Sequence, residues 1–384
     1  NGQRSRVNNM TNTEVFQPQF TKIAENIPGS EGPVFDKEGR FFMVAPERTK
    51  GGHFAGDILQ INLNDGKIMC MNSESLTVSY SIETLSMLQR SFGSPVSLIT
   101  LVCSLKVSSL LQPVAQVLAG SRTHVTQGVR KPSVHCAPVV GGEGGIPAGC
   151  QCDKDNNLWV ADMRLGILKI QPDGSFQQLC KTDSDGRVMQ GCNDCIYDYS
   201  GTLWVTAPAG DIAPAPFRRS MEEPFGSVYC VVNQKDVIRI DTNYRFSNGI
   251  AVLHSNDGRP KTLIVAETPT KTLWQYDILG PGKVGPKKFW GKLPGDHQGG
   301  PDGMDFDEDN NLLVTNHGSS YIEVFGPEGG DPIARIKCPF HSPSNVHFQP
   351  HTNIVYVTEH ELHGLWKFEW KRKGKLQYCD TIRF

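Results

Sequence analysis

The sequence predicts an all-β protein with the architecture of a six-bladed β-propeller around a central channel. A loose pattern occurs six times: a small residue, alternating apolar residues, a polar turn and a short apolar strand. The copies begin at Glu31, Ala148, Asn193, Asn248, Asp302 and Ser344. Each copy predicts a β-hairpin, because apolar residues alternate on both sides of a turn rich in Asp, Asn and Gly. Apart from the first pair, neighbouring copies are about 40 to 55 residues apart, which is typical of propeller blades.

The two ends of the chain are expected to meet and close the ring. Residues 1–19 are polar and lack a hydrophobic signal segment, which predicts an N-terminal extension and a cytoplasmic protein. Residues 20–384 are predicted to form a single propeller. In it, a strand at 20–27 pairs with the carboxyl-terminal segments 365–370 and 375–384. Such closure removes the exposed sheet edges that an open ring would leave.

Residues from about 70 to 140 interrupt the repeat. They are rich in Ser, Val and Leu and lack the hairpin pattern, so the second copy begins 117 residues after the first. Part of this segment is apolar enough to suggest a membrane-spanning helix, but Lys106 and Pro113 interrupt it. A single span would also place two blades of one ring on opposite sides of a membrane. We favour a disordered segment or a gene-model artefact over a surface insertion, and expect no function from it.

The composition argues against several classes of partner. The formal net charge of −2 gives no reason to expect binding to nucleic acid or to a membrane. A closed propeller without an apolar face is expected to be a monomer that binds a small molecule. Eleven cysteines, an odd number without framework spacing, favour reduced thiols. The pair Cys192 and Cys195 is spaced like a redox motif or half a zinc site, but packing as small apolar residues is the favoured interpretation.

The first residue of each copy is predicted to lie at one level of the channel. Four of the six carry carboxylate or amide oxygens: Glu31, Asn193, Asn248 and Asp302. Hard oxygen donors suit Ca²⁺, whereas zinc favours His or Cys. The sequence therefore predicts a metal-lined channel. Asp305 and His347, three residues further along the fifth and sixth copies, suggest a second, deeper ion. The alternative is a polar channel that binds only water.

Two further features bear on a site at the channel mouth. The Pro-rich connection 211–225 is long enough to lie over the channel, where Arg219 and Met221 could shape a pocket or simply be solvated. His360 ends a predicted strand near the channel. It is interpreted as a catalytic base, a hydrogen-bonding wall residue or a structural histidine.

Specific motifs in the chain resemble a known family. They include SEGPVFD, GGIPAGCQCD, MQGCNDC, VAETPTK, DGMDFDEDNNLLV and PSNVHF. With these, residues of about 20–66 and 144–384 resemble the diisopropylfluorophosphatases, calcium-dependent phosphotriesterases among the gluconolactonase-like six-bladed propellers. The resemblance implies an enzyme that hydrolyses organophosphorus esters and fluorides.

The resemblance also implies two Ca²⁺ ions and a set of site residues. A catalytic ion would be held by Glu31, Asn193, Asn248 and Asp302. A structural ion would be held by Asp305, His347 and the carbonyl of Val346. Asp194 would orient the ligand asparagines, and Asp302 would either attack phosphorus or orient an attacking water. The pocket wall would consist of Ile146, Met163, Arg219, Met221, Phe246, Thr268, Ser344 and His360.

One position departs from the family pattern. The motif LLVTNHGSS places His317 in the wall where the family has Trp, which removes a large apolar side chain and adds a titratable one. Two alternatives remain open on the same scaffold. One is a lactonase that uses calcium to polarise a lactone carbonyl, and the other is a non-catalytic calcium-binding propeller.

Overall fold

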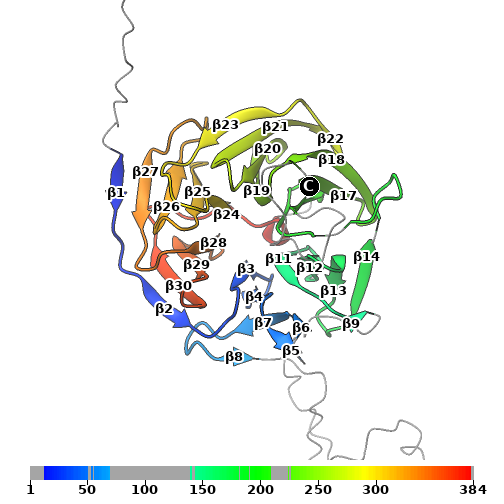
Figure 1. Ribbon diagram of the computed structural model, residues 1–384, viewed down its shortest axis with the longest axis horizontal. Helices are drawn as coiled ribbons and strands as arrows, with labels where there is room; N and C mark the ends of the chain where they lie inside the picture. Colours follow the sequence, from blue (N-terminus) through cyan, green and yellow to red (C-terminus); the bar gives the residue numbers. More distant parts are fainter. Residues whose placement is uncertain are drawn as a thin grey trace, which may run out of the picture. The chain divides into compact units, whose positions relative to one another are not determined.

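In the part of the chain that the structure describes, six β-sheets of four or five strands form the blades of a ring (Figure 1). The structure is a computed structural model that describes residues 13–50, 53–54, 56–69, 139–140, 143–180, 182–189, 191–208, 224 and 226–381. The six predicted hairpins are the innermost hairpins of the blades: β3 (Glu31–Phe35) with β4 (Phe41–Ala45), β11 (Pro147–Cys152) with β12 (Leu158–Asp162), β15 (Cys195–Tyr197) with β16 (Leu203–Ala207), β19 (Ser247–His254) with β20 (Pro260–Glu267), β24 (Pro301–Phe306) with β25 (Leu312–Asn316), and β28 (Pro343–Phe348) with β29 (Ile354–Glu359).

Further strands complete each blade toward its outer edge. In chain order they are β7 (Asp57–Ile61), β8 (Ile68–Met69), β13 (Gly166–Ile170), β14 (Phe176–Cys180), β17 (Gly226–Val232), β18 (Asp236–Tyr244), β21 (Thr272–Gly280), β22 (Lys283–Val284), β23 (Lys288–Lys292), β26 (Tyr321–Phe325), β27 (Ala334–Lys337) and β30 (Gly364–Glu369). Two short ribbons lie outside the blades: β5 (Thr49–Lys50) with β6 (His53–Phe54), and β9 (Val139–Val140) with β10 (Glu143–Gly144).

The inner strands contact one another in a closed cycle that runs β3, β11, β15, β19, β24, β28 and back to β3. All described residues belong to one compact unit. The predicted six-bladed β-propeller is confirmed. The hairpins form because their alternating apolar residues are buried between neighbouring blades, as the fully buried strands β4 and β16 illustrate.

The amino-terminal part of the chain closes the ring, as predicted. β2 (Thr21–Ala24) pairs antiparallel with β30 and forms the outer strand of the sixth blade (Figure 1). Part of the predicted N-terminal extension also belongs to the propeller. β1 (Glu14–Phe16) pairs parallel with β27 at the edge of the fifth blade, where the ring of Phe16 packs edge-on against Trp370.

The expected strand at 375–384 is wrong for the residues that the structure describes. Residues 375–381 contain only one turn of 3₁₀ helix, η3 (Tyr378–Asp380), and reach away from the sixth blade. Tyr378 stacks on Tyr197 of the third blade, and the carbonyl of Leu376 accepts a hydrogen bond from Tyr199 Oη at 2.7 Å. These aromatic contacts hold the segment across the ring instead of at a sheet edge.

Two predictions concern segments with little or no description. The interruption at about 70–140 lies outside the described residues except for its last two positions, and the connection 211–225 is described only at residue 224. Cys192 and Cys195 are described, and both are buried in one apolar cluster, as the packing interpretation expects. Among the described residues, no helix combines the length and the apolar character needed to cross a membrane.

Candidate metal centre and cavity

A cavity of about 820 Å³ opens at one end of the channel, where the inner strands begin. Five of the six first positions of the repeat line it: Glu31, Ala148, Asn193, Asn248 and Asp302. The rest of its lining includes apolar side chains from the loops between strands, namely Pro46, Ile146, Met163, Phe246 and Pro269. The structure therefore brings the four predicted oxygen-bearing side chains to one place, beside an apolar wall.

Irregularities at the start of the inner strands direct these side chains into the cavity. The strand register shifts next to Glu31 in β3, near Asn248 in β19 and near Asp302 in β24. A β-bulge lets two neighbouring residues of one strand face one residue of its partner, which turns a side chain away from the regular alternation. Glu31, Asn248 and Asp302 lie at such shifts, whereas Asn193 precedes β15, whose pairing with β16 is regular.

The residue after each first position explains how closely the blades approach one another. It is Gly32, Gly149, Gly249 or Gly303 in four copies, and a Cβ atom at any of these would lie 2.0–3.0 Å from the next blade. The other two copies carry Asp194 and Asn345 here. Asp194 Oδ1 lies 2.8 Å from the Cβ position of Gly149, and Asn345 lies against Gly303. Glycine in four blades makes room on the axis for the polar side chains of the other two.

Thr268 fixes which atom of Asn248 faces the cavity. Its hydroxyl donates to the carbonyl of Pro301 at 2.8 Å, so it accepts from the Nδ2 amide of Asn248 at 3.1 Å. The amide nitrogen is thereby committed and the Oδ1 oxygen remains to face the cavity. Thr268 lines the cavity as predicted, and it also positions a predicted ligand.

Three carboxyl groups repel one another at this end of the channel. Burial, and then the charges of Glu31 and Asp194, raise the pKa of Asp302 well above its usual range. Burial chiefly raises the pKa of Asp194 to about 7, with a further contribution from Glu31, although its Oδ1 accepts the N–H of Cys195 at 2.8 Å. A site that concentrates buried carboxylates in this way stabilises a cation and is costly without one.

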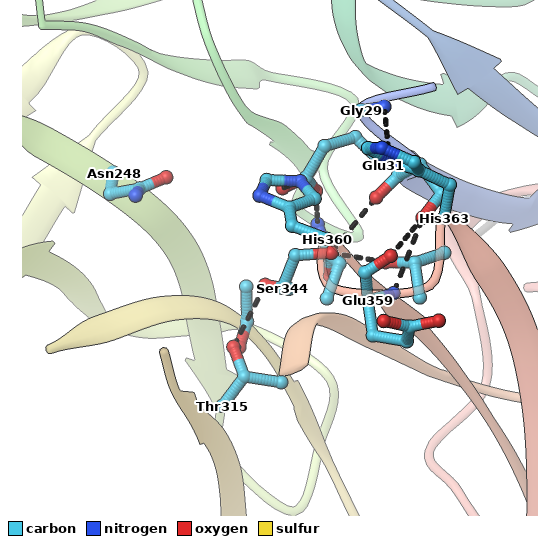
Figure 2. Close-up of polar contacts among 12 residues, drawn as sticks. Gly29, Glu31, Asn248, Thr315, Ser344, Glu359, His360 and His363 are labelled. Carbon is cyan, nitrogen blue, oxygen red and sulfur yellow. Dashed lines mark hydrogen bonds and ion pairs between the residues drawn. The ribbon is translucent and has the colours of Figure 1, made fainter. Parts of the chain in front are cut away.

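Three histidines border the same cavity: His297, His317 and His360. Figure 2 shows His360 beside Glu31, with a distance of 3.1 Å between Nε2 and Oε1. Burial opposes the charge on His360, but the bond to Glu31 and the nearby charges of Glu47 and Glu359 outweigh it and raise its pKa. The ring of His317 stands edge-on to His360 at 5.4 Å. Burial, and then the neighbouring His360, lower the pKa of His317 to about 4, so its imidazole is neutral at neutral pH.

The predicted second site lies deeper along the channel. A small cavity of about 20 Å³ is bordered by Asp305, Val346 and His347, together with Asp194 and Asn345. His347 Nδ1 lies 3.3 Å from Asp305 Oδ2, and the volume is enough for one water molecule or ion. Asp305 Oδ2 also accepts the N–H of Phe348 at 2.9 Å, which fixes the carboxylate.

The donor set fits a hard cation better than a transition metal. The described residues contain no group of three or more His, Cys, Asp and Glu side chains arranged to hold a metal ion. The upper set instead mixes two carboxylates with two amides, and the lower set mixes a carboxylate, an imidazole and a carbonyl. Oxygen-rich sets of this kind match the preferences of Ca²⁺, which takes six to eight oxygens and completes its shell with water.

Among the described residues, Ser344 is the one predicted wall residue that does not line the cavity. Its side chain is fully buried, and its Oγ bonds to the carbonyl of Ser30 at 2.9 Å and to Thr358 Oγ1 at 2.8 Å. Figure 2 shows its backbone carbonyl accepting from Thr315. Ser344 thus joins the sixth blade to the first. Arg219 and Met221 lie outside the described residues.

Sequence reasoning missed several residues of the cavity wall. They come from loops outside the repeat and are Gly29, Pro46, Glu47, Pro269, His297, Gln298 and Gly299. Gly29 had a local signal, since it precedes a first position by two residues, as Ile146 and Phe246 do. The loop residues around His297 had none.

Fold and cavity together define a six-bladed propeller with an oxygen-lined cavity where its inner strands begin. Comparison with known proteins shows the family to which the chain belongs. The model of the SMP-30/gluconolactonase/LRE-like region matches residues 119–361, and the chain belongs to this family.

A diisopropyl-fluorophosphatase from Loligo vulgaris is 52% identical over 371 residues, which cover 96% of this chain and 98% of that protein. A gluconolactonase from Zymomonas mobilis is 23% identical over 207 residues, 52% of this chain and 57% of the relative. Among solved structures, a regucalcin from Agrobacterium tumefaciens, described as a calcium-binding protein, superposes with a TM-score of 0.63. It covers 95% of this chain and 98% of its own at 17% identity, which supports the fold alone.

Proposed function

We propose that the protein is a calcium-dependent hydrolase of organophosphorus esters and fluorides that cleaves bonds such as P–F. One observation carries the proposal: Glu31, Asn193, Asn248 and Asp302 meet in a single cavity that also has an apolar wall. Oxygen ligands at the base and apolar side chains above suit a neutral ester that has one polar phosphoryl oxygen and two alkyl groups. The 52% identity to a diisopropyl-fluorophosphatase along nearly the whole chain supports the same chemistry.

In this proposal Ca²⁺ takes the four oxygen-bearing side chains of the upper cavity as ligands. When bound there, the ion acts as a Lewis acid toward the phosphoryl oxygen of the substrate. A second ion is proposed at Asp305, His347 and the carbonyl of Val346, where it stabilises the inner strands. Asp194 lies between the two levels and lines the lower cavity. Its backbone hydrogen bond holds the carboxylate toward the channel, close enough to influence Asp302.

The chain's own groups supply the remaining chemistry. In one route Asp302 attacks phosphorus as fluoride leaves, and water then hydrolyses the phosphoryl–aspartate ester. In the other, Asp302 orients a water whose oxygen bonds to phosphorus as fluoride leaves and whose proton passes to solvent. Both roles need a carboxylate kept ionised and aimed at phosphorus. The hydrogen bond from Asn248 Nδ2 to Thr268 leaves the Oδ1 oxygen of Asn248 to face the cavity. His360 pairs with Glu31, with 3.1 Å between Nε2 and Oε1, so it serves as a wall and positioning residue or as a base. The apolar wall from Ile146, Met163 and Phe246 excludes water around the ester groups.

Two other functions remain as alternatives. A lactonase would use the same carboxylates and amides toward a lactone carbonyl, and the partial likeness to a gluconolactonase favours it as the second candidate. A non-catalytic calcium-binding propeller would keep the ion sites without turnover. The apolar wall favours dialkyl phosphoesters over polyhydroxylated lactones, because burying hydroxyl groups without partners is costly.

The test is fluoride release from diisopropyl fluorophosphate, measured with calcium and after chelation. Wild type is compared with Asp302→Asn, and Asp309→Asn serves as the matched control, since Asp309 is an exposed acid of the same blade. We expect release that requires calcium and Asp302 and survives in the control. Absence of release from folded, calcium-loaded wild type would overturn the proposal, and lactone hydrolysis would then be assayed on the same samples.

Cytoplasmic location, a monomeric state and the absence of nucleic-acid or membrane partners stay predictions. Gel filtration with light scattering tests the monomer directly.

A further inference from the structure

One wall of the cavity is a loop without regular secondary structure. Residues 294–299 connect β23 to β24, and His297, Gln298 and Gly299 line the cavity. Most of the loop is exposed to solvent and none of it belongs to a strand. Sheet hydrogen bonds therefore do not fix this wall, and its position depends on side chains that reach it from neighbouring elements.

Lys271 is the principal contact of this loop. Its Nζ donates to the carbonyl of His297 at 2.7 Å and to the carbonyl of Gly299 at 2.8 Å. Lys271 lies in the turn between β20 and β21, two residues after the cavity-lining Pro269. Its own carbonyl accepts the N–H of Leu293 at 2.8 Å, just before the loop begins. One charged side chain thus bonds two carbonyls of the wall from a well-anchored turn.

A second set of contacts fixes the loop from the fifth blade. Arg335 binds both carboxylate oxygens of the fully buried Glu323 at 2.6 and 2.8 Å. Glu323 accepts from Asn316 Nδ2 at 3.0 Å, and the same amide donates to the carbonyl of Pro294 at 3.2 Å. Asn316 Oδ1 must then be the acceptor for His297 Nε2 at 3.0 Å, which makes Nε2 the protonated nitrogen of His297. Because His297 Nε2 donates its proton to Asn316, it is not an acceptor for Lys271. Lys271 therefore bonds the loop through the carbonyls of His297 and Gly299.

The loop also packs directly against the backbone that carries His317. A Cβ atom at Gly299, which has a φ of 101°, would lie 2.3 Å from the carbonyl oxygen of His317. A Cβ atom at Gly318 would lie 2.4 Å from the carbonyl oxygen of Gln298. These two backbones touch without side chains between them. A displacement of the loop therefore changes the cavity at Gln298 and at His317 together.

We propose that Lys271 is a positioning residue that fixes loop 294–299 as a wall of the cavity and thereby limits the bulk of the substrate's ester groups. The inference rests on the proposed function, because it takes the cavity to be the substrate site. It adds a residue that does not line the cavity and sets which phosphoesters fit. Loss of the two hydrogen bonds frees the backbone from His297 to Gly299, while Asn316 still holds Pro294 and the His297 ring. Large substrates therefore gain room and the proposed ion site keeps its ligands.

The experiment uses Lys271→Met, which keeps the aliphatic stem and removes the donor. Its matched control is Lys288→Met, which removes an exposed lysine from β23 of the same blade. The probes are dimethyl and dibutyl phosphofluoridate, assayed for kcat and KM separately. We expect the ratio of kcat/KM for dibutyl over dimethyl to rise about threefold to tenfold, with kcat for the dimethyl ester changed less than about twofold. Lys271→Arg, which keeps donors for both carbonyls, should restore the wild-type ratio.

Hydrogen–deuterium exchange provides a readout that does not need turnover. The hydrogen-bonded amides at the two ends of the loop, those of Leu293 and His317, should exchange faster in Lys271→Met, while those of β24 and β25 keep wild-type rates. A general loss of stability would instead speed exchange throughout and lower kcat without changing the substrate ratio. Wild-type exchange at these two amides together with a wild-type ratio would overturn the proposal. If wild type releases no fluoride, the proposed function fails, and the exchange result alone decides the role of Lys271. If Lys271→Met does not fold, Lys271→Gln, which keeps one amide donor, takes its place with the same outcomes.

Discussion

The close approach of the inner strands can be tested at Gly249, which follows the predicted ligand Asn248. A Cβ atom added there would lie 2.0 Å from the carbonyl oxygen of Asp302 and 2.9 Å from its carbonyl carbon. Since carbon and oxygen need about 3.3 Å, β19 and β24 would have to separate by about 1.3 Å. Both strands are hydrogen-bonded within their own blades, so this overpacking should cost about 2 to 3 kcal/mol of unfolding free energy.

Gly326 supplies the matched control for Gly249→Ala. A Cβ atom at Gly326 would meet nothing closer than a methyl group of Ile333 at 3.8 Å, and its backbone is not in the left-handed region. Gly326→Ala should therefore be neutral or stabilise by about 0.5 kcal/mol, because alanine restricts the unfolded chain. The two variants add the same methyl group, so the difference between them isolates the contact on the channel axis.

The assay is urea unfolding of both variants, followed by fluoride release in calcium. Gly249→Ala should lower the midpoint relative to Gly326→Ala with an unchanged slope. Because the added methyl group clashes with the backbone of Asp302, the rate of fluoride release by Gly249→Ala should fall on the order of 100-fold. This is the loss expected for a displacement of about 1 Å at a reacting group. Equal midpoints and equal rates for the two variants would refute the argument that glycines set the geometry of the ligand ring.

Three further predictions concern buried polar groups and the ion. Trp159→Phe removes the indole donor of Asp153 Oδ2 at 2.8 Å and leaves a buried carboxylate short of a partner. It should cost about 2 kcal/mol in urea unfolding, and an unchanged midpoint would contradict this. Burial, and then Lys375, lower the pKa of His254 to about 3 in the folded state, so stability is lost as pH falls below about 6.5. Between pH 7.5 and 5 wild type should lose about 2 kcal/mol more than His254→Gln, and parallel pH profiles would count against the assignment. Chelation of calcium should lower the Tm and excess calcium should restore it, because the proposed ion binds the folded state; a Tm indifferent to calcium would speak against both ion sites.

The repeat could be predicted from sequence because its signals are local. Alternating apolar residues and Asp-rich turns mark each inner hairpin, and the structure places all six where the pattern begins. In the fifth blade, for example, Asp307 Oδ1 accepts the backbone N–H groups of Asp309 and Asn311 and closes the turn between β24 and β25. Equal positions in equal hairpins lie at equal heights, so the repeat also placed Glu31, Asn193 and Asn248 correctly around one cavity.

Predictions failed where the chain leaves the repeat. Ser344 has the right position in its copy, but it lies where the last blade meets the first, and its hydroxyl is taken up by Ser30 and Thr358. Residues 375–381 are predicted to form a strand, yet the side chain of Tyr378 stacks on Tyr197 of the third blade. In both cases a contact between residues distant in sequence decides the outcome, and no local pattern records it.

The proposed function also has one part that comes from the repeat, the ion ligands, and one part that comes from single loops, the cavity wall. The ion ligands come from the repeat, so any chain that builds these hairpins with oxygen-bearing first residues presents the same chemistry. The wall that selects among substrates comes from single loops. Lys271, His297 and Asn316 follow one another at intervals of 26 and 19 residues and belong to three different connections or strands. Because such contacts can change without disturbing the hairpins, proteins that share the hairpins can differ in substrate, and His317 beside this loop is the position where the sequence predicts such a difference.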